Sequence, residues 1–130
     1  MMKNETNIDK IVNVIRESGL SPSKIPDIVN WYMYAFKEGM VCTERDNDKF
    51  GFVDWIRIPL IPKSVKEARE IFSEVQEGPV MMILSCYADT SEILWKLKRS
   101  IMEASKDCAV LIWHNKKKDK MFVYKNRRKA

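Results

Sequence analysis

The segment that most constrains the fold is residues 79–88 (PVMMILSCYA), an almost unbroken run of apolar side chains. A strand with one solvated face alternates apolar and polar residues, so this run predicts a strand covered on both faces at the centre of a sheet. A helical stripe follows over 91–105, and Asp89 and Glu92 before it have capping-box spacing. A second apolar strand follows at 108–114 (CAVLIWH). Strand, helix and strand at this spacing predict a βαβ unit with parallel strands.

The flanking sequence supplies elements of other kinds. Apolar residues at helical spacing predict helices, and β-rich runs separated by turn formers predict strands. The predicted fold class is α/β (α+β), with a mixed central sheet, helices on its faces and the order α-α-β-β-α-β-α-β-β. The remaining predicted elements are helices 6–18, 26–38 and 64–77, a hairpin of strands 40–46 and 50–58, and an edge strand 120–125.

Length and composition are those of one domain. The chain has 130 residues, 45% hydrophobic and 32% charged, and it contains no linker or repeat. We predict a single α/β domain over 1–125 and a basic tail over 126–130. No apolar run approaches the roughly 18 residues of a membrane span, and the first ten residues are too polar for a secretory signal, so we expect a cytoplasmic protein without a membrane span.

Cysteine and histidine usage bears on redox and metal chemistry. The three cysteines, Cys42, Cys86 and Cys108, are odd in number and far apart in apolar contexts, which predicts reduced core thiols and no disulfide framework. His114 is the single histidine, and no CxxC or HxxxH spacing is present. We therefore expect no metal site.

Positive charge is concentrated at the C-terminus. Residues 115–130 contain eight Lys or Arg and one acid, whereas the rest of the chain has fifteen basic and seventeen acidic residues. One interpretation is a surface that binds nucleic acid or an acidic protein. Trp113, Phe122 and Tyr124 would then be available to stack on nucleic-acid bases. The other is a solvated tail that aids solubility. The residues predicted to bind are Lys116, Lys117, Lys118, Lys120, Arg127 and Arg128.

The order of elements resembles that of the GNAT acyltransferase superfamily. Three segments are also similar to the RTX-toxin-activating lysine acyltransferases: FGFVDWI (50–56), EILWKLKRSI (92–101) and VLIWHNKKKDKMFVY (110–124). The resemblance implies that strands 79–88 and 108–114 splay apart to admit an acyl thioester. It also implies that an acyl group passes from acyl-CoA or an acyl carrier thioester to an amine.

The cofactor loop departs from the superfamily. The resemblance places the phosphates of the donor at backbone amides near Ala88, Thr90 and Ser91. The loop contains no glycine, and Asp89 in it repels phosphate. The family also uses an early histidine, whereas no histidine precedes His114 here. The chain is thus interpreted as acyltransferase-related with a degenerate cofactor loop, or as a small non-enzymatic binding module that uses its basic C-terminal hairpin and tail.

Three residues are candidates for proton transfer. Asp54 matches the acidic position of the family and could act as a base with a raised pKa, or strand alternation could send it to the solvent face with Phe52 and Ile56. Tyr87 could protonate a thiolate leaving group, as the resemblance implies, or pack against helix 91–105. His114 could serve as acid or base, or lie exposed beside the Lys-rich turn.

Overall fold

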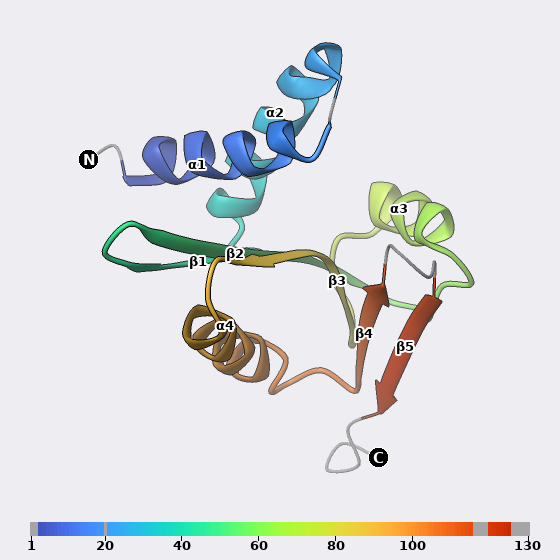
Figure 1. Cartoon of the computed structure of the whole chain (residues 1–130). Coiled ribbons are helices and arrows are strands. Elements are labelled where there is room, and N and C mark those ends of the chain that lie inside the picture. The colour runs from blue at the N-terminus through green and yellow to red at the C-terminus, as the bar shows by residue number, and fades with distance from the viewer. Residues whose placement is uncertain (1–2, 20, 116–119, 126–130) are drawn as a thin grey trace.

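The predicted α/β fold is confirmed. The computed structural model describes residues 3–19, 21–115 and 120–125, and these form a five-stranded mixed sheet with helices on both faces (Figure 1). The elements lie within a few residues of the predicted bounds and in the predicted order. They are α1 (Lys3–Glu17), a short 3-10 helix (Pro22–Lys24), α2 (Ile25–Lys37), β1 (Val41–Asp46), β2 (Lys49–Ile58), α3 (Val65–Glu74), β3 (Val80–Ala88), α4 (Ser91–Ala104), β4 (Val110–Asn115) and β5 (Lys120–Lys125).

The strands lie side by side in chain order, β1-β2-β3-β4-β5. The hairpin β1–β2 is antiparallel, as are the pairs β2–β3 and β4–β5. The pair β3–β4 is parallel, which confirms the βαβ unit predicted from the apolar run. Met81 and Met82 at its centre are fully buried, one on each face of the sheet, as expected for a central strand.

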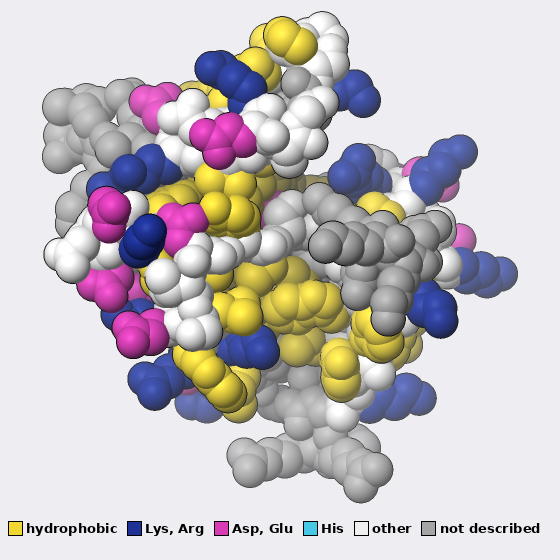
Figure 2. Space-filling model, in the orientation of Figure 1, with side chains coloured by type: hydrophobic (Ala, Val, Ile, Leu, Met, Phe, Trp, Pro, Cys, Tyr) yellow, Lys and Arg dark blue, Asp and Glu magenta, His cyan; other side chains and the backbone are white. Residues whose placement is uncertain are grey.

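The helices cover the two faces of the sheet unequally. α4 packs below β1, β2 and β3 in Figure 1, and buries Ile93, Leu97 and Ile101 there. The helices α1, α2 and α3 lie on the opposite face. β4 and β5 lie beside α4 rather than over it, and Figure 2 shows apolar side chains gathered over this region.

Side-chain caps mark the N-termini of α3 and α4. Ser64 caps α3 by accepting the Glu67 N–H at 3.1 Å, and Glu67 accepts the Lys63 N–H, so the predicted capping box is confirmed. The prediction for α4 is wrong by one residue, because Thr90 is the N-cap and accepts the Ile93 N–H at 3.2 Å. Asp89 instead accepts the N–H of Phe50 on β2 at 2.8 Å.

Gly51 allows α4 to lie close to the sheet. A Cβ atom at this position would overlap Ile93 Cγ2 of α4 and crowd the backbone oxygen of Tyr87 on β3. Only glycine therefore fits at this contact without a shift of the helix, and the first turn of α4 is held against β2.

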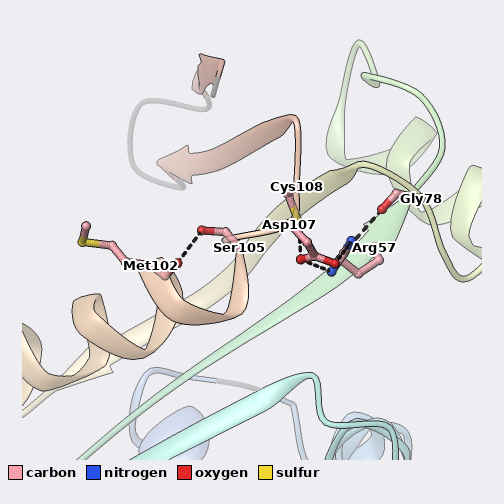
Figure 3. A network of polar contacts seen from close by, with 6 residues as sticks. All are labelled: Arg57, Gly78, Met102, Ser105, Asp107 and Cys108. Carbon is pink, nitrogen blue, oxygen red and sulfur yellow. Dashed lines mark hydrogen bonds and ion pairs between the residues drawn. The ribbon is translucent and has the colours of Figure 1, made fainter. Parts of the chain in front are cut away.

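Arg57 on β2 holds together the end of the sheet where β3 and β4 begin (Figure 3). Its Nε donates to the Gly78 carbonyl at 3.0 Å, and its guanidinium forms an ion pair with Asp107 at 3.4 Å. Asp107 in turn accepts the Cys108 thiol at 3.9 Å, and the Ser105 hydroxyl donates to the Met102 carbonyl at 3.3 Å. The loops before β3 and after α4 are thus joined to one residue of β2.

No helix in the described part of the chain is long and apolar enough to cross a membrane. The three cysteines are free thiols: Cys108 is buried, whereas Cys42 and Cys86 are half-buried. The basic tail predicted over 126–130 lies outside the described residues.

Candidate functional site

The parallel strands β3 and β4 pair over only part of their length. Their register runs from Val80 opposite Val110 to Ile83 opposite Trp113. Beyond this point β3 continues to Ala88 along β2, and β4 continues along β5. The two central strands therefore separate at their carboxyl ends, and Figure 1 shows β3 bending away from β4.

A bulge between β2 and β3 lies at the point of separation. Asp54 is opposite Ser85 and Trp55 is opposite Ile83, so Leu84 is an extra residue on β3. A bulge bends its strand and increases the local twist. The bend directs residues 85–88 along β2 and away from β4.

A cavity of about 940 Å³ occupies this separation. Ile83 and Trp113 of the diverging strands line it, and α1, α2 and α3 contribute Ile15, Ile28 and Phe72 on one side of the sheet. Leu94 in the first turn of α4 lines it from the other side. The cavity thus passes through the sheet where the strands part. Most of its wall is apolar, which suits a ligand with a hydrocarbon portion.

Asp54 is the buried carboxylate of this cavity. Only 1% of its surface is exposed, so the interpretation that strand alternation sends it to solvent is wrong. The same face of β2 also buries Phe52 and Ile56, because α2 and its neighbours cover it.

Two side chains of α2 hold the Asp54 carboxylate. Trp31 Nε1 donates to Oδ2 at 2.9 Å, and the Tyr32 hydroxyl donates to Oδ1 at 3.2 Å. A buried carboxylate requires such donors, because its charge has lost contact with water. Burial, followed by the charge of Asp54, raises the pKa of Tyr32 far above its usual value, whereas a hydrogen bond with Ser85 acts in the opposite direction. Tyr32 therefore remains a protonated donor that orients Asp54.

Tyr87 lines the same cavity from the end of β3. Its ring stacks on Phe52 with centroids 6.1 Å apart, and its hydroxyl donates to Asp89. This hydrogen bond is the main reason that the pKa of Tyr87 is raised and that of Asp89 is lowered, and the Phe50 N–H lowers the pKa of Asp89 further. Tyr87 thus keeps its proton and donates a hydrogen bond to Asp89.

His114 lines the cavity from β4 and is half-buried rather than exposed. All three residues predicted to transfer protons, Asp54, Tyr87 and His114, therefore lie around one cavity. Sequence reasoning missed Trp31 and Tyr32. Their signal was weak, because a Trp-Tyr pair on an amphipathic helix is also typical of ordinary core packing.

The predicted phosphate-binding residues lie apart from this cavity. Ala88 is paired with Gly51, the Thr90 hydroxyl caps α4, and Ser91 is exposed at the first position of that helix. The carboxylate of Asp89 lies directly before the helix N-terminus, where it opposes the binding of a polyphosphate.

The cationic residues predicted to bind nucleic acid or an acidic partner are mostly outside the described residues. This applies to Lys116, Lys117, Lys118, Arg127 and Arg128, whereas Lys120 is exposed at the start of β5. Within the described ranges, no group of three or more His, Cys, Asp or Glu side chains is placed to hold a metal ion.

Comparison of the chain with protein-family models, with curated proteins and with solved structures finds no match.

Proposed function

We propose that this protein is an acyltransferase that binds an acyl thioester in the cavity between β3 and β4 and uses Asp54 as general base toward an amine. The observation that carries the proposal is the separation of two parallel central strands over a cavity whose buried carboxylate is held by two hydrogen bonds from α2.

The shape and polarity of the cavity suit a thioester donor. The arm that carries the thioester is long and narrow, and it contains amides that bond to a strand edge. The backbone of β3 beyond Ile83 offers such an edge, because among the described strands it pairs there with β2 alone. The apolar walls from α1, α2 and α3 would surround the acyl group.

Proton transfer in the reaction requires one base and one acid. As the amine nitrogen attacks the thioester carbonyl, a C–N bond forms and the amine proton passes to Asp54. Collapse of the tetrahedral intermediate breaks the C–S bond, and the departing thiolate takes a proton from Tyr87 or His114. The Tyr32 and Trp31 donors fix the direction in which Asp54 accepts the proton.

Negative charge at the start of α4 favours a donor with a single phosphodiester over acyl-CoA. Asp89 and Glu92 place negative charge at the helix N-terminus, where a nucleotide pyrophosphate would otherwise bind. A donor with a single phosphodiester, such as an acyl carrier thioester, meets less repulsion there than acyl-CoA. We therefore expect the protein to use acyl-pantetheine or a carrier-bound acyl group at least as well as acyl-CoA.

The test is transfer of a labelled acyl group to an amine, measured together with thiol release. Purified protein is given acyl-CoA or acyl-pantetheine of short and long chain length, with a lysine peptide as acceptor. Asp54→Asn should lower the rate by a factor of about 100 or more, whereas Asp48→Asn in the exposed β1–β2 turn should have no effect. The proposal fails if no thioester is consumed, or if Asp54→Asn remains fully active while folded.

A further inference from the structure

Among the described residues, only half of the α4 side of the sheet is covered by a helix. α4 packs on β1, β2 and β3, whereas four side chains of β4 and β5 share this face with no described helix over them. They form the open β4–β5 face, which we define as Leu111, Trp113, Phe122 and Tyr124. Cross-strand pairs place them together, because Leu111 is opposite Tyr124 and Trp113 is opposite Phe122.

This face is apolar and partly exposed. Phe122 is 42% exposed and Tyr124 is 58% exposed, while Leu111 and Trp113 are half-buried. Figure 2 shows hydrophobic side chains gathered beside α4, in the region of β4 and β5. A sheet face of this composition is normally buried against a second layer. The described residues of the chain supply that layer only over β1–β3.

Cations border the open β4–β5 face on both sides. Leu94, Lys98 and Met102 lie four residues apart on one side of α4, and Leu94 on that side lines the cavity beside Trp113. Met102 is 72% exposed. Lys120 lies on the same face of β5 as Phe122 and Tyr124 and is exposed at the start of the strand. The border is thus positive, and a complementary partner is acidic.

The depth of the uncovered region indicates the form of the partner. A helix with its side chains is about 10 Å thick, so the sheet beside α4 is recessed by about that amount. A flat lipid surface resting on the outer side of α4 would not reach the recessed side chains. Two copies meeting face to face would bring Lys98 and Lys120 of both into opposition, which disfavours self-association.

We infer that the open β4–β5 face binds an amphipathic helix of another protein, whose apolar stripe covers Phe122 and Tyr124 and whose flanking acids pair with Lys98 and Lys120. This helix lies beside α4 and completes the second layer of the sheet. Its test is separate from that of the acyl transfer proposed above, because it varies Tyr124 and leaves Asp54 unchanged.

The probe is a fluorescently labelled helical peptide of about five turns, with a leucine stripe flanked by glutamates. Its twin has lysines in place of the glutamates. Anisotropy should show binding of the acidic peptide at about 50 mM salt, weaker binding at about 300 mM, and none of the lysine twin. Tyr124→Glu should raise the Kd at least about tenfold. Val123→Glu is the matched control, because Val123 is 43% exposed on the opposite face of the same strand.

The expected result is charge-selective binding that Tyr124→Glu weakens at least about tenfold and Val123→Glu leaves within about twofold. Absence of binding to the acidic peptide, or equal loss in both variants, overturns the inference. Tyr124-dependent binding to vesicles containing phosphatidylglycerol or to a DNA duplex, in place of the acidic peptide, also overturns the inference. A wild-type dimer that Tyr124→Glu dissociates, measured by sedimentation velocity, would assign the face to a second copy and also overturn it.

Discussion

The hydrogen bond between Tyr32 and Asp54 provides the sharpest test of how the cavity is built. Tyr32→Phe keeps the ring that packs against Phe52, with centroids 5.9 Å apart, and removes only the hydroxyl that donates to Oδ1 of Asp54. A hydrogen bond to a charged group contributes about 1.5–3 kcal/mol to stability. Both residues are buried, so the substitution leaves Oδ1 of Asp54 without this donor.

We therefore expect Tyr32→Phe to lower the free energy of unfolding by about 2 kcal/mol and the Tm by about 7 °C. The measurement is urea unfolding followed by tryptophan fluorescence. Tyr34→Phe is the matched control on the same helix. Tyr34 is 36% exposed and its ring contacts Trp31 and Phe72, contacts that phenylalanine keeps, so the change should be under about 0.5 kcal/mol.

A double-mutant cycle separates the hydrogen bond from other effects of the substitution. Tyr32→Phe, Asp54→Asn and the double variant should give a coupling energy of about 1–2 kcal/mol, because the two side chains contact each other directly. A coupling energy near zero, or a loss in Tyr32→Phe no larger than that in Tyr34→Phe, would refute the view that α2 holds the carboxylate in place.

Three further predictions concern other residues around the site. The folded-state pKa of Asp89 is lowered, so its contribution to stability is present above its unfolded pKa and is lost as pH falls through the folded value. As the pH is lowered below about 4, the free energy of unfolding measured in urea should therefore decrease less for Asp89→Asn than for wild type. Gly51→Ala forces Ile93 and α4 away from β2 and should cost about 1–3 kcal/mol of unfolding free energy in the same assay. Burial raises the pKa of the Cys86 thiol, so iodoacetamide should alkylate Cys86 more slowly than a free thiol. A thioester bound in the cavity should slow the alkylation of Cys86 further, but not that of Cys42, as measured by mass spectrometry.

The secondary structure and the central pair of strands could be predicted from the sequence because their signals are local. The apolar run at 79–88 and the helical stripe after it determine a βαβ unit by themselves, and Ser64 with Glu67 marks the start of α3. The cap of α4 was assigned one residue early, since Asp89 and Thr90 are both good capping residues. The structure distinguishes the two residues, because Asp89 accepts the Phe50 N–H of β2 and leaves the cap position to Thr90.

The surroundings of Asp54 could not be predicted in this way. Alternation along β2 correctly grouped it with Phe52 and Ile56, but a strand's own pattern does not say what covers that face. The donors that hold it, Trp31 and Tyr32, are 23 and 22 residues away in sequence. Their role depends on how α2 packs across the sheet, which involves long-range contacts rather than periodicity.

The opening between β3 and β4 results from two features at opposite ends of these strands. At the paired end, Arg57 bonds both the Gly78 carbonyl and Asp107, and so ties the segments before β3 and β4 to β2. At the other end, the bulge opposite Asp54 bends β3 along β2 and away from β4. If only the bulge were present, β3 and β4 could slide in register, and if only the Arg57 contacts were present, the strands would remain paired along their whole length. Together they fix where the sheet opens, and the residue opposite the bulge is Asp54, the carboxylate of the cavity.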